Sequence, residues 1–173
     1  MTVMIAIDQG TTSTRTVAYD KGLNIIHSEQ KEYPLLYPND GWVEIEPKEL
    51  MRSVYSTIDP IIEICPDIVA AGITNQRETT LIWDADSGIP IYNAIVWQDR
   101  RTADQCMQLK QAGYEEAIKK KTGLLLDPYF SSTKISWILD NVNGARARAE
   151  AGKLRFGTVD TYLLWQLSKG DIF

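Results

Sequence analysis

The sequence predicts an α/β domain in which strands and helices pack in layers. Residues 1–33 alternate apolar, β-branched runs with turns, which predicts three consecutive strands. Residues 47–59 carry apolar side chains at helical spacing and predict a helix after those strands. A further apolar run, residues 68–74, predicts another strand. The chain therefore begins βββαβ, and mixed strands and helices continue to its end.

The individual strands follow from short runs of β-forming residues. The first three are residues 3–7, residues 15–19 and a run centred on Ile25 and Ile26. Residues 68–74 should form a buried strand because the run is continuously apolar. Three further strands are predicted at residues 79–83, 90–97 and 154–156.

The first helix should begin at Pro47, because a proline at the first helical position loses no intrahelical hydrogen bond. Four apolar residues recur at helical spacing and should face the core: Leu50, Met51, Val54 and Ile58. Pro60 has no N–H to continue this helix, so a second short helix should start there. Later helices are predicted at residues 101–110, 114–121, 145–151 and 159–167.

Two of the later helices carry end signals. Gly123 should end the helix at residues 114–121, because glycine tolerates the left-handed conformation of a C-terminal cap. Ser131 or Ser132 should cap another helix through a side-chain oxygen. Three apolar residues of that helix should point inward: Ile135, Ile138 and Leu139.

Length, charge and cysteine content limit the possible functions. With 173 residues and 44% hydrophobic content, the chain can bury one sizeable core but not two large domains. Its net charge of −5 argues against a nucleic-acid surface. His27 is the only histidine, and Cys65 and Cys106 are isolated, which argues against a zinc site or a Ser-His-Asp triad. Lone thiols and a short N-terminal apolar run predict a cytoplasmic protein without membrane insertion.

The loop after the first strand combines a carboxylate, a glycine and three hydroxyl side chains. Gly10 lets the backbone approach a ligand, and the hydroxyls of Thr11, Thr12 and Ser13 suit phosphate oxygens. Asp8 would repel such oxygens without a cation between them, so we expect Mg²⁺, held through water. The loop joins two strands and lacks Gly-Lys-Ser/Thr, so it is not a Walker-type P-loop. Taken alone, the motif is more typical of an ordinary polar hairpin turn.

Two adjacent opposite charges, Arg77 and Glu78, follow the apolar run of residues 68–74. A polyol hydroxyl can donate to a carboxylate and accept from a guanidinium, so this pair suits a polyol. Neighbouring residues of a regular strand point to opposite faces, so both can touch one ligand only if the chain bends at Arg77. The alternative is a solvent-facing ion pair, contributing roughly 0–1 kcal/mol.

Two aromatic residues complete the candidate polyol site. Trp97 ends a predicted strand, where ligands meet the sheet, and its ring could pack on the C–H face of a small polyol. Pro128 fixes the backbone before Tyr129, whose phenol could reach a substrate oxygen. Each aromatic residue, taken alone, also fits ordinary packing.

Together these segments resemble the N-terminal part of the FGGY carbohydrate kinase family, and within it the glycerol kinases. The resemblance runs from residues 5–13 to residues 156–161 and covers the whole chain. Asn75-Gln76-Arg77-Glu78 is the most discriminating segment, because many sugar kinases of the family carry a Gly-Gln-x-His type of sequence there. The resemblance implies a ribonuclease H-like, actin-like ATPase fold (βββαβα). Residues 1–173 would form most of its N-terminal domain, incomplete and without the C-terminal domain.

The resemblance also implies a reaction and the residues that serve it. With Mg²⁺ as cofactor, ATP would phosphorylate glycerol to sn-glycerol 3-phosphate. Glycerol contacts fall on Arg77, Glu78 and Tyr129, with Trp97 as the aromatic wall. Contacts with the ATP phosphates fall on Thr11, Thr12, Ser13 and Arg15, with Asp8 near the metal. The resemblance further implies a whole enzyme that is a homo-oligomer, either a dimer or a tetramer.

One part of the family pattern is missing. No aspartate of the chain matches the Gly-Asp-Gln type of motif that carries the family's catalytic base, so we expect no catalytic residue in these 173 residues. The chain should therefore be a piece of a longer enzyme and inactive alone. Three alternatives stay open: another FGGY kinase acting on a longer sugar, a catalytically dead binding module, and an Hsp70-like or actin-like ATPase.

Overall fold

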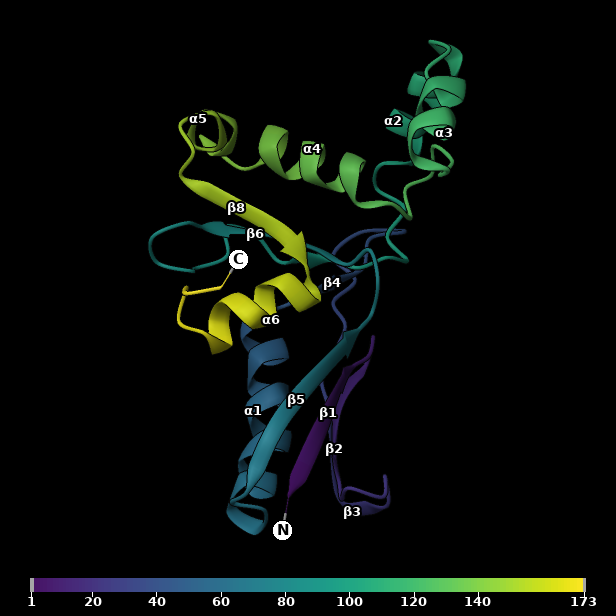
Figure 1. Cartoon of the computed structure of the whole chain (residues 1–173). Coiled ribbons are helices and arrows are strands. Elements are labelled where there is room, and N and C mark those ends of the chain that lie inside the picture. The colour runs from purple at the N-terminus through teal and green to yellow at the C-terminus, as the bar shows by residue number, and fades with distance from the viewer. Residues whose placement is uncertain (1, 173) are drawn as a thin grey trace. The chain divides into compact units, whose positions relative to one another are not determined.

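The structure, a computed structural model, describes residues 2–172, which fold into two compact units. Unit 1 consists of residues up to 35 and residues 45–76, and unit 2 consists of residues 36–44 and residues from 77 onward. The single core expected from the chain length is thus divided between two units. The elements, in chain order, are β1 (Val3–Gln9), β2 (Ser13–Tyr19), β3 (Ile25–Glu32), β4 (Glu44–Ile45), α1 (Pro47–Ile64), β5 (Ile68–Asn75), β6 (Thr80–Asp84), β7 (Ala94–Ile95), α2 (Ala103–Gln111), α3 (Glu115–Thr122), α4 (Ser131–Asn141), α5 (Ala145–Glu150), β8 (Leu154–Thr158) and α6 (Val159–Leu167) (Figure 1).

Unit 1 is a four-stranded sheet with the order β3-β2-β1-β5 (Figure 1). The helix α1 packs on β2 and β3. The first three strands are antiparallel, and β5 runs parallel to β1. Alternate residues of β1 are buried, from Val3 to Gln9, because successive side chains of a strand point to opposite faces. Asp8 therefore lies on the other face, where it is exposed. The predicted βββαβ order is confirmed, with the short β4 as an addition.

Buried hydroxyl pairs join α1 to β2. Thr14 Oγ1 lies 2.6 Å from Ser53 Oγ, and Thr16 Oγ1 lies 2.8 Å from Thr57 Oγ1. Each helix hydroxyl also donates to a carbonyl of α1 one turn earlier, so the strand threonines must donate to the helix hydroxyls. These polar groups are satisfied, which removes most of the free-energy cost of burying them.

Two sequence predictions for unit 1 are wrong. Pro60 does not end the first helix, because α1 continues through it to Ile64. The carbonyl that loses its donor belongs to Ser56, which is exposed and therefore accessible to water. The run at residues 68–74 forms a strand, β5, but most of it is exposed, because β5 is an edge strand and α1 packs on β2 and β3 instead.

Unit 2 is built on β6, which pairs antiparallel with β7 and β8. Ile82 of β6 packs with Ile138 of α4 in a buried cluster. Trp83, the next residue, packs against α6, with 5.3 Å between its ring centroid and that of Tyr162. Neighbouring strand residues face opposite sides, so α4 and α6 cover opposite faces of β6 (Figure 1). This double cover explains why residues 80–83 are all buried.

Other elements of unit 2 agree with prediction to varying degrees. The helix at residues 159–167 has the predicted bounds, and Gly123 ends α3 with a φ of 74°. The strand predicted at residues 90–97 is shorter, because only β7 and a single bridge from Pro90 to Trp83 pair there.

Among residues 2–172, no helix is long and apolar enough to cross a bilayer.

The packing of α4 on β6 predicts a large cost for removing Ile138, which is fully buried. Ile138→Ala should lower the free energy of unfolding by about 2–5 kcal/mol, because it leaves a cavity in the core. Urea titration of the purified protein measures this. Ile62→Ala is the matched control, since Ile62 is 51% exposed, and it should change stability much less. Equal losses in the two variants would contradict the packing described for α4.

Candidate functional site

The loop between β1 and β2 is a tight turn. The N–H of Gly10 donates to the carbonyl of Ser13 over 2.9 Å, which closes the turn, and the intervening Thr12 is exposed. A Cβ atom at Gly10 would lie 3.2 Å from that same carbonyl oxygen, so a side chain is tolerated poorly there. The hydroxyls predicted for phosphate binding therefore lie together on this turn.

A buried network holds the carbonyl of Gly10. It accepts hydrogen bonds from the hydroxyl of Tyr33, from Gln9 Nε2 at 2.8 Å and from Gln76 Nε2 at 2.9 Å. Burial raises the pKa of Tyr33 to about 12, so its phenol remains a proton donor at neutral pH. The sequence analysis assigned no role to these three residues. The alternation of buried and outward-facing residues along the first strand was the one sequence signal that Gln9 is buried.

Asp8 and Arg15 lie directly opposite each other in the β1–β2 ladder, so their side chains share one face of the sheet. The guanidinium of Arg15 donates from Nε to Ser28 Oγ at 3.1 Å, which turns it along β3. Ser13 Oγ accepts from Gln30 Nε2 at 3.1 Å. Residues 2–172 contain no group of three acidic, histidine or cysteine side chains that could hold a metal. An exposed single carboxylate such as Asp8 fits Mg²⁺, which keeps most of its waters and binds protein through few ligands.

Glu78 occupies the turn between β5 and β6 with a φ of 62°, in the left-handed region. The turn comprises Arg77 and Glu78, so the chain bends at Arg77 as the polyol hypothesis requires. The Oε2 atom of Glu78 accepts hydrogen bonds from the N–H and the hydroxyl of Ser131, at 2.9 and 2.7 Å. The carboxylate of Glu78 thus caps α4. The prediction that Ser131 or Ser132 is the cap residue is wrong, because Phe130 occupies that position.

Lys134, in the first turns of α4, is fully buried. Its ammonium donates to the carbonyl of Glu78 at 2.5 Å and to that of Tyr129 at 2.8 Å. Desolvation lowers the pKa of Lys134 to about 8, although the carboxylates of Glu78, Asp99 and Asp127 act in the opposite direction. No sequence pattern indicated that Lys134 is buried, because a lysine between serines and threonines at a helix start is usually solvated.

The aromatic residues of the candidate site lie beside each other. The ring centroids of Trp97 and Tyr129 are 5.8 Å apart, in an edge-to-face arrangement at 67°. The N–H of Trp97 donates to Thr79 Oγ1 at 3.2 Å, and the N–H of Tyr129 donates to Asp127 Oδ1 at 2.8 Å. Both backbones are therefore fixed by side-chain acceptors, that of Trp97 by a residue just before β6 and that of Tyr129 by a residue of its own segment.

A buried arginine fixes the segment that follows Trp97. The side chain of Arg101 is fully buried and forms ion pairs with Asp99 at 2.8 Å and Glu44 at 2.7 Å. Its guanidinium carbon lies 3.9 Å from the centroid of the Trp42 ring. Removing one partner would leave a buried charge uncompensated, so this cluster holds its segments firmly.

Arg77 differs from the other three predicted polyol residues. It is exposed, and within residues 2–172 its guanidinium makes no hydrogen bond or ion pair. The structure therefore links Glu78 to Tyr129 through the two carbonyls that Lys134 bonds, and Tyr129 to Trp97 through their ring contact, whereas Arg77 is adjacent to Glu78 only in sequence. The surface ion pair considered as an alternative is not formed, since Glu78 bonds to Ser131 instead.

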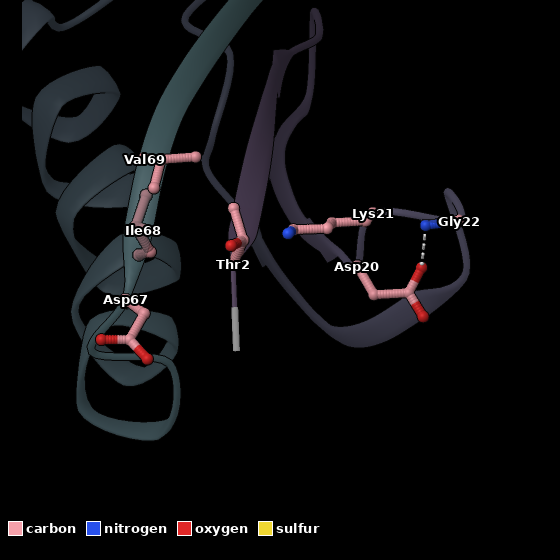
Figure 2. A pocket seen from close by; sticks show the side chains of 7 residues that line it. All are labelled: Thr2, Asp20, Lys21, Gly22, Asp67, Ile68 and Val69. Carbon is pink, nitrogen blue, oxygen red and sulfur yellow. Dashed lines mark hydrogen bonds between the residues drawn. The ribbon is translucent and has the colours of Figure 1, made fainter.

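Several hollows lie in the described parts of the chain. In unit 2, a cavity of about 240 Å³ has Glu78 in its wall, with Leu126 and Phe130 among its apolar lining. In unit 1, a more open hollow lies at the start of β1, away from the phosphate loop at its other end (Figure 2). Figure 2 shows that the carboxylate of Asp20 bonds there to Gly22 of its own turn, at 2.8 Å. Asp20 thus stabilises a turn, whereas the cavity of about 240 Å³ in unit 2 borders the predicted site residue Glu78.

Comparison with known proteins gives consistent matches over the whole chain. A model of the FGGY family of carbohydrate kinases, N-terminal domain, matches residues 3–172. A glycerol kinase of Geobacillus sp. (strain WCH70) is 54% identical over 96% of this chain and 34% of its own length. A glycerol kinase of Allorhizobium ampelinum is 55% identical over 98% of this chain and 35% of its own length.

Solved structures agree with these matches. The structure of Plasmodium falciparum glycerol kinase with ADP has a TM-score of 0.92 and 35% identity, covering 99% of this chain and 35% of that protein. This match confirms the predicted fold class. The chain spans about a third of the length of the curated relatives it matches.

The burial of Lys134 predicts an unusual titration. Its ammonium should lose its proton near pH 8, whereas an exposed lysine does so near 10.5. Because the folded pKa is the lower one, the contribution of Lys134 to the free energy of unfolding should increase as the pH rises from about 8 to about 10.5. NMR of ¹³C-labelled lysines measures the titration, with Lys134→Met identifying the signal. A Lys134 signal that titrates with the exposed lysines would contradict this burial.

Proposed function

The chain belongs to the FGGY family of carbohydrate kinases, and from this premise we propose that the protein containing it phosphorylates glycerol with ATP. The products are sn-glycerol 3-phosphate and ADP. The observation that carries the choice of acceptor is the cluster of Glu78, Tyr129 and Trp97, which combines a carboxylate, a phenol and an aromatic face. The high identity to glycerol kinases supports the same choice.

The proposed glycerol contacts follow from the bonding capacity of each side chain. Glu78 uses Oε2 for Ser131, and within the described residues no donor reaches Oε1, which remains for a glycerol hydroxyl. The hydroxyl of Tyr129 can donate to or accept from a second hydroxyl. Trp97 supplies the apolar wall for the carbon chain. Arg77 is proposed to donate to a glycerol oxygen, as an exposed guanidinium next to Glu78 in sequence.

The proposed nucleotide contacts lie on the β1–β2 turn. Thr11, Thr12 and Ser13 donate to phosphate oxygens, and Arg15 adds positive charge near them. Asp8 would hold Mg²⁺ together with the phosphates, and the cation would neutralise part of their charge. The network at the carbonyl of Gly10 keeps the turn in one conformation, so its donors need no reorganisation when a phosphate arrives.

These residues are proposed to act by positioning the acceptor and the phosphate. Phosphoryl transfer depends on in-line placement of acceptor and phosphate and on charge neutralisation, more than on covalent help from the protein. No residue of the chain is assigned as the base that removes the acceptor proton. The activity is therefore proposed for the whole protein, in the cytoplasm, where buried thiols such as Cys65 and Cys106 remain reduced. The expected homo-oligomer stays a prediction.

The role of Glu78 is tested by Glu78→Ala in the whole protein. The variant loses a charge-assisted hydrogen bond worth roughly 1.5–3 kcal/mol, which is about a ten- to hundredfold loss of kcat/KM for glycerol. A coupled assay of ADP release measures this across a panel of glycerol and longer sugars. Glu116→Ala, a change on the exposed face of α3, should leave the kinetics unaltered. Unchanged glycerol kinetics in Glu78→Ala, or a preference of the wild type for a longer sugar, would refute the proposal.

The isolated chain of residues 1–173 should show no glycerol-dependent ADP release. It carries the proposed phosphate turn and glycerol contacts but no assigned base, and water is not excluded from them by any further domain. The same coupled assay measures this, with the whole protein as positive control. Turnover by the isolated chain would show that a base lies within these residues.

A further inference from the structure

We propose that Lys134 is a positioning residue for the polyol acceptor, because its buried ammonium joins the backbones of Glu78 and Tyr129. The inference rests on the proposed function and deepens it. Glu78 and Tyr129 come from segments far apart in the sequence, the turn after β5 and the segment before α4. Their carbonyls are both bonded to the one ammonium, at 2.5 and 2.8 Å. Lys134 thus sets the spacing between two side chains that must reach the same small molecule.

The backbone of Glu78 needs such a partner. A φ of 62° places this non-glycine residue in the left-handed region, which costs about 1–2 kcal/mol. Such a conformation persists only where the surroundings over-determine it. Lys134 donates to the carbonyl of Glu78, and Ser131 donates to its carboxylate. The helix α4 therefore holds both the backbone and the side chain of Glu78. Ser131 and Lys134 are three residues apart and therefore lie on one face of the helix.

The charge of Lys134 also suits a site for an uncharged ligand. Glycerol brings no cation to balance the carboxylate of Glu78, and the charges of Glu78 and Lys134 attract each other. A neutral side chain could join two carbonyls without the cost of burying an ammonium. The buried ammonium therefore places a positive charge near the carboxylate that is proposed to accept a glycerol hydroxyl.

The test is steady-state kinetics of the whole protein with Lys134→Met, which keeps an apolar stem of similar length and removes the ammonium. We expect KM for glycerol to rise at least tenfold and KM for ATP to change less than twofold. Lys119→Met is the matched control, because Lys119 is exposed on α3, and it should match the wild type. A residue that acts only on folding would reduce the active fraction and leave both KM values unchanged.

A double-mutant comparison separates positioning from a general effect. If Lys134 acts through Glu78, Lys134→Met should raise KM for glycerol much less in a Glu78→Ala background. If Lys134→Met yields no folded protein, Lys134→Leu, which also removes every donor to the two carbonyls, is judged by the same criteria. An unchanged KM for glycerol in the folded variant overturns the inference and leaves the proposed function standing. A wild type that does not phosphorylate glycerol overturns both.

Discussion

The contact between the start of α4 and the turn at Glu78 is the constraint on which the candidate acceptor site depends. The carboxylate of Glu78 bonds to Ser131, and its carbonyl bonds to the buried ammonium of Lys134. The same ammonium reaches the carbonyl of Tyr129, which lies against Trp97. A strained backbone, an acid and two aromatic rings are thereby fixed by one helix terminus. These side chains are therefore held in place before a ligand binds, which lowers the entropic cost of binding.

The phosphate turn of unit 1 is held in a comparable way. The carbonyl of Gly10 accepts hydrogen bonds from Tyr33, Gln9 and Gln76, all of them buried, while Thr12 of the same turn is exposed. In both units, groups that suit a ligand lie on segments that buried polar residues hold by hydrogen bonds. Buried polar groups of this kind are favourable only when they are fully bonded, so each network specifies one conformation.

The sequence predicted much of this arrangement and missed its supports. Local patterns sufficed for the βββαβ order and the loop at Gly10, because strand alternation and turn chemistry are short-range properties. Pro60 misled the analysis, since an exposed carbonyl can lose its helix donor to water at little cost. Lys134 and the capping of α4 by Glu78 could not be predicted, because they depend on contacts between segments distant in the chain. The exposure of β5 likewise depends on its position at the sheet edge, which no local pattern reveals.

A crystal structure of the whole protein with bound glycerol tests the central claim most directly. The account predicts one glycerol hydroxyl within hydrogen-bond distance of Glu78 Oε1, another near the hydroxyl of Tyr129, and the carbon chain against the ring of Trp97. Lys134 should remain bonded to both carbonyls. Glycerol ordered away from these side chains, or Glu78 released from Ser131 and turned to solvent, would contradict the account.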